Sequence, residues 1–478
     1  MKKEMPVWLA ALPVVVLVGA ASLSVCVWKA GMLMPLVIGV LAAALVAAMA
    51  GFKWTDVQEM MVRGVGRTLP AVFILLLIGL IVGSWMASGV IPAIIYYGLS
   101  LIHPSVFVPI VALVTGIVSI TLGSSFTSIA TVGLAFMAIG DGLGFPAGLV
   151  GGAVISGAYF GDKLSPLSDT TNIAPAIAET DLFSHIRHML WDTLPAFALS
   201  IVLYAIVGRS FASAGTADAE SIRSIQAGLA DQFVIHPLLL LLPVLTIVLM
   251  VKRIPAVPAL AGVGLLAAVV AVFVQGMPVS EVIQAMTSGF TADTGIPAVD
   301  SLLNRGGMTS MLNTVALLVI ATALGGILEE SGSFEVLTRK MMASVKSSGS
   351  LIASTIFSTF VVAFASGAQF LAIVLPSRTF VPKYKEMGVD TVNLSRCVEA
   401  AGTVGINLVP WSVPAVFAAG MFGISPGQFI PYAFFVFLVP LLNLVFGFTG
   451  FTIKKKMYNA EPAMIQTEEK EEVPGWAK

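Results

Sequence analysis

Residues 161–171 read Gly-Asp-Lys-Leu-Ser-Pro-Leu-Ser-Asp-Thr-Thr, so this short stretch carries two carboxylates, one ammonium group and four hydroxyl side chains. It follows sequence of membrane character, because Asp141 is the only Asp, Glu, Lys or Arg between Thr68 and Gly161. A charged side chain at the centre of a bilayer costs about 3 kcal/mol or more, and charged residues retained there mark ion or proton pathways. The contrast predicts a membrane-spanning helical protein that handles ions near residues 162–171.

The composition independently places the chain in a lipid bilayer. Hydrophobic residues make up 57% of its 478 positions and charged residues only 11%, against about 25% charged in a soluble domain. No basic cluster suggests nucleic acid, and no nucleophile and base constellation or metal-binding His pair suggests an enzyme. The two cysteines, Cys26 and Cys397, suggest neither a disulfide framework nor a thiolate metal site.

Apolar runs in the chain are long enough for spans, which need roughly 20 residues each. These runs begin near Pro6, Met34, Pro70, Ser105, Trp191, His236, Pro255, Met311, Ser350 and Gln428. We therefore expect an all-α polytopic protein of the cell membrane that needs no cofactor.

The distribution of charge in the loops predicts an orientation, because Lys and Arg favour the cytoplasmic side. The segments 211–231 and 276–305 are mainly acidic and are predicted to be external. Both termini are then cytoplasmic, and the acidic tail, residues 457–478, is expected to be solvated. The basic residues are Lys2, Lys3, Lys53, Arg63, Arg67, Lys252, Arg253, Lys454, Lys455 and Lys456.

The two halves of the chain resemble each other, with matching positions in the same order. The matches are 54–61 with 279–286, Ser88-Gly89 with Ser331-Gly332, and Gly161, Leu164, Pro166 and Ser168 with Gly405, Leu408, Pro410 and Ser412.

These matches predict a first membrane repeat at residues 1–215, an external linker at 216–231 and a second repeat at 232–456. The loop at Trp54 is predicted to be internal and its counterpart at Glu281 external, so the two repeats are expected to be inverted in topology. Inverted repeats are a common plan of secondary transporters, whose sites lie near the midplane on broken helices.

Each half also contains an interruption of an apolar run, at residues 123–128 and at residues 365–369. Gly, Ser and Thr lower helix propensity there and offer hydroxyls and freed carbonyls. Irregular backbone at membrane depth is tolerated where it lines protein or water. Close helix packing through small residues is an alternative for the first interruption, whereas the pairing of the two favours broken or re-entrant helices at a binding site.

The candidate site centres on Asp162 and Asp169, which Pro166 separates by preventing a continuous helix. Sodium, as a hard cation, favours oxygen ligands. We predict a sodium site at Asp162 and Asp169, where a dehydrated sodium ion and a proton replace each other. Further first-repeat candidates are Ser165, Ser168, Thr170, Thr171, Asn172, Ser124, Ser125 and Thr127. The second-repeat candidates are Ser366, Gln369, Arg396, Glu399, Thr403, Asn407 and Ser412.

Structural roles are alternatives for several candidates. Lys163 is placed to form an ion pair with its neighbour Asp162. Residues 168–171 fit the cap of a helix that begins near Asn172, which does not exclude ion binding.

Two more alternatives concern charged residues near the candidate site. Arg396 and Glu399 are three residues apart, which suits a buried pair on one helix face. His185, Arg187 and His188 lie on a short amphipathic segment, predicted to rest at the cytoplasmic interface, with pH sensing as the alternative.

Long motifs in the chain resemble the signature of the NhaC family of sodium/proton antiporters. They are residues 156–175, which contain the opening stretch, residues 180–189, and the later segments 395–399 and 408–411. The resemblance covers nearly the whole chain and implies an inverted-repeat ion-transporter fold, sodium ions and protons as substrates, and a homodimer.

The second motif departs from the family pattern. The family more usually has an acidic residue and Ser where Ala400 and Ala401 stand, and polar residues where Val413 and Pro414 stand. Members of the family also include exchangers of malate for lactate and carriers of amino acids. Sodium/proton exchange and coupled transport of a small organic acid or amino acid are therefore both compatible with the sequence.

Overall fold

The computed structural model describes residues 5–28, 30–101, 103–215, 219–252, 254–294, 299–300, 303–304, 306–342 and 345–456. Within these residues the regular structure is helical, apart from an isolated β-bridge between Val389 and Lys455. The all-α prediction is confirmed. The apolar runs predicted as spans coincide with helices, and the run at Trp191 belongs to a helix that already begins at Leu182.

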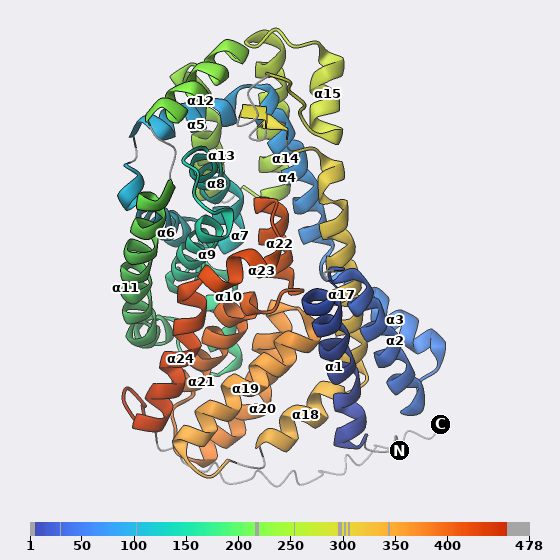
Figure 1. The fold of residues 1–478 in the computed structure, drawn as a ribbon. Coiled ribbons are helices and arrows are strands. Elements are labelled where there is room, and N and C mark those ends of the chain that lie inside the picture. The colour runs from blue at the N-terminus through green and yellow to red at the C-terminus, as the bar shows by residue number, and fades with distance from the viewer. Residues whose placement is uncertain are drawn as a thin grey trace, which may run out of the picture.

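The helices follow one another along the chain as Figure 1 labels them. Those of the first half are α1 (Val7–Ser22), α2 (Leu33–Met49), α3 (Trp54–Gly66), α4 (Leu69–Ala87), α5 (Val90–Leu101), α6 (Pro104–Leu122), α7 (Ser125–Ser128), α8 (Leu134–Gly142), α9 (Ala147–Leu164), α10 (Asp169–Ile177) and α11 (Leu182–Gly215). Those that follow are α12 (Ala219–Gln232), α13 (Leu241–Val251), α14 (Ala256–Phe273), α15 (Val279–Ser288), α17 (Leu312–Glu330), α18 (Ser333–Met342), α19 (Ser348–Ser366), α20 (Gln369–Glu386), α21 (Thr391–Val398), α22 (Val413–Phe422), α23 (Pro426–Phe429) and α24 (Phe434–Thr449).

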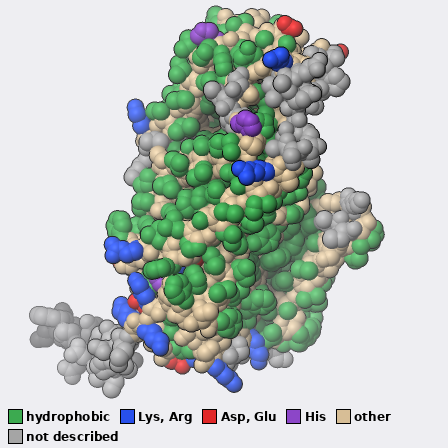
Figure 2. All heavy atoms as spheres, turned by 60° about the vertical axis from the view of Figure 1, so that its left-hand side comes forward, with side chains coloured by type: hydrophobic (Ala, Val, Ile, Leu, Met, Phe, Trp, Pro, Cys, Tyr) green, Lys and Arg blue, Asp and Glu red, His purple; other side chains and the backbone are tan. Residues whose placement is uncertain are grey.

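The architecture is that of a multi-pass membrane protein. In the described part of the chain, five helices are long and apolar enough to cross a bilayer, and four further helix pairs bend by more than 40° at a short break. Each bent pair is either a broken span or a re-entrant loop. Apolar side chains cover the middle of the face in Figure 2, while Lys and Arg gather mainly toward its lower end.

Two close backbone contacts between the halves agree with the repeat alignment, because each joins a helix of one half to a helix of the other. A Cβ atom at Gly326 of α17 would lie 2.3 Å from the carbonyl oxygen of Met60 in α3. A Cβ atom at Gly83 of α4 would lie 2.0 Å from the carbonyl oxygen of Ala285 in α15. Met60 and Ala285 hold the same position in the aligned segments. In Figure 1, α15 lies near the upper end of the molecule and α3 lies in its lower half, which agrees with inverted repeats.

Both predicted helix breaks are present. α6 ends before Gly123, which has a φ of 67°, and α19 ends before Gly367, which has a φ of 62°. Only glycine adopts this left-handed conformation without steric cost. The next helices, α7 and α20, begin two residues later, so a short non-helical turn interrupts the chain at each position.

The close approach of α9 to α6 places the candidate carboxylate. A Cβ atom at Gly157 would lie 2.3 Å from the carbonyl oxygen of Ala112, and one at Gly161 would lie 2.4 Å from that of Gly116. Small residues permit such backbone contact between membrane helices. Because Asp162 follows Gly161, this contact sets the depth and rotation of its side chain.

The predicted linker is largely helical, since most of residues 216–231 belong to α12. Residues 216–218 and the predicted acidic tail, 457–478, lie outside the described residues. The domain boundaries stay a prediction.

Candidate ion-binding site

Asp162 lies in the last turn of α9 and is only 5% exposed. Its Oδ2 accepts a hydrogen bond of 2.7 Å from Ser125 Oγ. Ser125 is the first residue of α7, directly after the first helix break. Among the described ion pairs, none involves Asp162. The carboxylate is therefore buried beside a broken helix, and its charge is not matched by a basic side chain.

The residues that follow α9 form the start of α10. Ser168 is its N-cap, and Ser168 Oγ accepts a hydrogen bond of 3.5 Å from the Thr171 amide. Thr171 Oγ1 donates to the backbone oxygen of Asp162 at 3.1 Å, and Asn172 Nδ2 donates to the Ser168 backbone oxygen at 2.7 Å. The helix-cap interpretation is confirmed, although α10 begins at Asp169 rather than near Asn172.

Other predicted ligands stabilise the turns around the carboxylate. Ser124 caps α7 and accepts hydrogen bonds from the Thr127 amide at 3.3 Å and from Thr127 Oγ1 at 3.1 Å. Ser165 Oγ donates to the Ile120 carbonyl oxygen at 2.7 Å. Ser168 Oγ lies 3.1 Å from Thr170 Oγ1. These hydroxyls hold the chain at the break, and the hydroxyls of Ser125 and Ser168 both lie next to the Asp162 carboxylate.

A cavity of about 660 Å³ lies next to the start of α10. Asp169, Thr170 and Asn172 line it from α10, and Gln369 lines it from the start of α20. The lining also includes Arg67 and Glu329, which form an ion pair with partly exposed side chains. Asp169 is exposed here. Asp162 is not among the residues that line the cavity, although Asp169, which does line it, lies close enough for the two charges to interact.

The second repeat contributes Glu399, Thr403 and Asn407, which are at most 1% exposed. They follow one another at intervals of four residues along a π-helical segment, Glu399–Val404, and the 3₁₀ turn Gly405–Leu408. In the part of the chain that the structure describes, neither carboxylate oxygen of Glu399 has a hydrogen-bond partner. Glu399 lies close enough to Asp162 for the two carboxylates to repel each other.

Three other second-repeat candidates surround the second break. Ser366 Oγ donates to the Val362 carbonyl oxygen at 2.7 Å, and Ser412 caps α22 by accepting from the Ala415 amide at 3.3 Å. Both hydroxyls are therefore used structurally. Gln369 lines the cavity, and its Nε2 has no partner among the described atoms.

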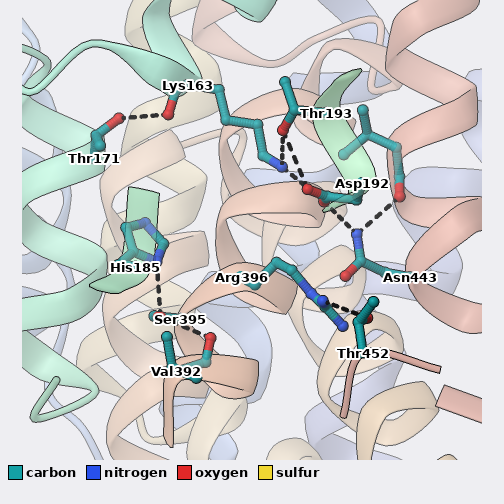
Figure 3. Close-up of polar contacts among 11 residues, drawn as sticks. Lys163, Thr171, His185, Asp192, Thr193, Val392, Ser395, Arg396, Asn443 and Thr452 are labelled. Carbon is teal, nitrogen blue, oxygen red and sulfur yellow. Dashed lines mark hydrogen bonds and ion pairs between the residues drawn. The ribbon is translucent and has the colours of Figure 1, made fainter. Parts of the chain in front are cut away.

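The alternative of an ion pair between Lys163 and Asp162 is contradicted, because Lys163 pairs with another carboxylate. Figure 3 shows Lys163 directed toward Asp192, with its Nζ 2.7 Å from Asp192 Oδ2 and 2.9 Å from Thr193 Oγ1. Asn443 Nδ2 donates to the same carboxylate oxygen at 2.6 Å. Adjacent residues of an α-helix point about 100° apart, so Asp162 faces α7 while Lys163 faces α11.

Asp192 was not identified from the sequence, although a signal was present. It is the only acidic residue in α11, a helix of 34 residues. Its side chain and that of Lys163 are both 0% exposed. An isolated acidic residue in an apolar run is a candidate for a buried charge pair. Sequence spacing alone did not identify Lys163 as its partner.

The alternative of a buried pair between Arg396 and Glu399 is contradicted as well, since neither Glu399 oxygen has a partner among the described atoms. Arg396 Nη1 donates to Thr452 Oγ1 at 2.9 Å, and the guanidinium lies 5.7 Å from the centre of the Phe446 ring. The α-helix changes to a π-helix at Glu399. The wider turn of a π-helix alters the side-chain direction, so residues three apart no longer share a face.

His185 and His188 are buried inside the protein, whereas Arg187 between them is exposed, and the position of this segment at the cytoplasmic interface stays a prediction. His185 Nδ1 lies 2.8 Å from Ser395 Oγ, and His188 Nε2 lies 3.1 Å from Asn393 Oδ1. Both belong to α11, which packs against α21, and residues three apart on a helix share a face. A role in pH sensing stays a prediction.

Comparisons with known proteins agree with this arrangement. The model of the Na+/H+ antiporter family matches residues 157–451. The chain is 40% identical to the Na+/H+ antiporter NhaC of Alkalihalophilus pseudofirmus, over 88% of this chain and 91% of that protein. It is 35% identical to the malate-2H+/Na+-lactate antiporter of Bacillus subtilis, over 85% and 87% of the two chains. It is also 35% identical to the arginine/ornithine antiporter ArcD of Halobacterium salinarum, over 90% and 88%. The chain therefore belongs to the Na+/H+ antiporter family and is a secondary transporter rather than an enzyme.

Proposed function

We propose that this protein exchanges sodium ions for protons across the cell membrane by alternating access, with both termini in the cytoplasm. The observation that carries the proposal is Asp162, a 5% exposed carboxylate at a helix break. A buried charge without an opposite charge is costly. Either a sodium ion or a proton removes that cost, so the two cations compete for the same group.

The surrounding charges support this competition. Lys163 is the nearest basic residue in the sequence, but its charge is compensated by Asp192 at 2.7 Å. Asp162 therefore keeps its need for a cation. Ser125 Oγ is held at 2.7 Å from the carboxylate and supplies a second oxygen of the kind that sodium favours.

The cavity gives a route for ions to this region. Asp169 and Thr170 form part of its lining, and Asp169 places a negative charge on the path toward Asp162. Asp162 itself does not line the cavity, so we infer that movement of the start of α10 would connect the two. We infer that Asp169 concentrates cations in the cavity and that Asp162 holds the transported ion.

The proposal is tested with purified protein in liposomes that contain a pH-sensitive dye. Addition of sodium alone is expected to move protons, and Asp162→Asn is expected to abolish this flux. Glu281→Gln, a change at an exposed carboxylate on α15, serves as the matched control. Absence of sodium-driven proton movement in the wild-type protein would reject sodium/proton exchange.

The size of the cavity supports a second candidate, the coupled transport of a small organic acid or amino acid. About 660 Å³ is far more than a sodium ion needs and lies in the usual range of small-molecule pockets. Gln369 presents a buried amide nitrogen without a partner at its wall. In the same liposomes, proton flux that requires malate, lactate or an amino acid would establish this function instead.

Assembly as a homodimer is a separate part of the proposal, which light scattering of the purified protein tests.

A further inference from the structure

Four side chains at the interface of the two halves carry buried oxygen atoms without hydrogen-bond partners. In the described part of the chain, these atoms are Glu399 Oε1 and Oε2, Thr403 Oγ1, Asn407 Oδ1 and the Tyr159 hydroxyl. All four side chains are at most 1% exposed. Buried polar atoms are nearly always satisfied in native proteins, so a concentration of unsatisfied atoms suggests an absent ion or ligand.

The four side chains form two pairs, which are joined where Asn407 Nδ2 lies 3.4 Å from the Thr403 backbone oxygen. Thr403 borders the Glu399 carboxylate, and Tyr159 borders Asn407. The π-helical segment Glu399–Val404 contributes to this arrangement, since π-helical turns inside α-helices occur frequently at functional sites. Two repeats therefore supply the group, with Tyr159 coming from α9.

The chemistry of these atoms suits a monovalent cation. Glu399 supplies the single negative charge, while Asn407 Oδ1 is an acceptor with no donor and the two hydroxyls can turn their lone pairs inward. Hard cations favour such oxygen sets. Of the neighbouring basic groups, Lys163 is paired with Asp192, while Arg396 donates through Nη1 to the Thr452 hydroxyl, and its Nε and Nη2 have no partner among the described atoms.

We propose that Glu399, Thr403, Asn407 and Tyr159 form a second sodium site, separate from the one at Asp162 and emptied when Glu399 takes up a proton. The inference deepens the proposed sodium/proton exchange and rests on it. Two sites would couple two sodium ions to each transport cycle. They would also explain why two repelling carboxylates are retained side by side in the protein interior.

Thr170 connects this site to the cavity. It lines the cavity and borders the Glu399 carboxylate, while its Oγ1 lies 3.1 Å from Ser168 Oγ, the cap next to Asp162. A cation that passes the α10 turn therefore meets both carboxylates.

The second site is not a copy of the first. The constant offset that aligns Gly161 with Gly405 places Ile406 at the position of Asp162 and Gln369 at the position of Ser125. The second repeat thus lacks the first site's carboxylate and hydroxyl. Its only carboxylate in the group, Glu399, stands seven residues earlier and has no acidic counterpart in the first repeat, since Ile155 stands there.

Equilibrium binding of radioactive sodium to the purified protein tests the proposal without requiring transport. We expect two sodium ions per wild-type chain, and one each in Glu399→Gln and Asp162→Asn. Glu281→Gln is expected to keep two. One ion per wild-type chain, or an unchanged stoichiometry in Glu399→Gln, overturns the second site.

A milder variant keeps the test valid if Glu399→Gln does not fold. Thr403→Val preserves the shape of the side chain and the Glu399 charge but removes one oxygen ligand. We expect it to weaken the second binding step at least tenfold and to leave the first unchanged. The proposal is contradicted if both binding steps are weakened equally or if neither is weakened.

Failure of sodium/proton exchange itself is distinguishable, because it shows as absent proton flux in wild-type liposomes, whatever the binding stoichiometry.

Discussion

Lys163 Nζ lies 2.7 Å from Asp192 Oδ2 in an ion pair with both side chains fully buried. The pair joins the end of α9 to α11, and Asn443 adds a hydrogen bond from α24 to the same carboxylate. Lys163 directly follows Asp162 in the sequence, yet it pairs with Asp192. Among the described ion pairs, the Asp162 carboxylate therefore has no basic partner. The same contact therefore holds three helices together and preserves the negative charge that a transported cation would meet.

Removing one partner of this pair is expected to destabilise the protein strongly. Lys163→Met leaves the Asp192 charge buried and unpaired, which costs about 3 to 5 kcal/mol in comparable sites. The double variant Lys163→Met with Asp192→Asn is expected to recover most of the loss, because both charges are then absent. Thermal unfolding in detergent measures the effect. A single variant as stable as wild type would show that the pair is not structural.

The two carboxylates of the opening stretch are expected to respond differently to substitution. Asp162→Asn should reduce sodium-driven proton flux to background, because the amide cannot exchange a proton for sodium. Asp169→Asn, at the cavity wall, should raise the sodium concentration for half-maximal flux about tenfold, equivalent to about 1.4 kcal/mol. Dye-loaded liposomes measure both. Normal flux in Asp162→Asn would remove this residue from the site.

The contact between α9 and α6 is expected to tolerate no added methyl group. In Gly161→Ala the new Cβ would lie 2.4 Å from the Gly116 carbonyl oxygen, and overpacking of this kind costs about 1 to 3 kcal/mol. Gly262→Ala in α14 is the matched control, since nothing lies within 4 Å of its Cβ position. Thermal unfolding should separate the two variants, and equal melting temperatures would contradict the packing argument.

Asp181, which precedes α11, is expected to give a pH-dependent contribution to stability. Its carboxylate accepts a hydrogen bond of 2.8 Å from the Ser184 amide, and this bond lowers the pKa of Asp181. A lowered folded-state pKa stabilises the protein above the unfolded-state value of about 4 and is lost at lower pH. Wild type should therefore melt above Asp181→Ala at pH 7, and the difference should shrink as the pH falls below about 4. A difference that persists at low pH would assign the effect to something other than the charge.

Much of the fold was predictable from the sequence because the relevant signals are local. The long apolar runs mark helices, and Gly123 and Gly367 mark the breaks at which a left-handed backbone is required. The repeat alignment correctly paired Met60 with Ala285. Their carbonyl oxygens lie against Gly326 and Gly83, which hold equivalent positions in the two repeats. The motif containing Asp162 was sufficient to indicate the family that the comparisons establish.

The partners of the charged side chains were decided only by the tertiary structure. Lys163 and Asp192 are 29 residues apart, and Asn443 is 251 residues from Asp192. One residue turns a helix by about 100°, so neighbours such as Asp162 and Lys163 face different helices, and sequence spacing cannot tell which helix lies on each side. The sequence by itself determined a broken-helix membrane transporter with carboxylates at its breaks. Helix packing decided which carboxylates are paired and which, like Asp162 and Glu399, have no basic partner among the described ion pairs and are our proposed cation ligands.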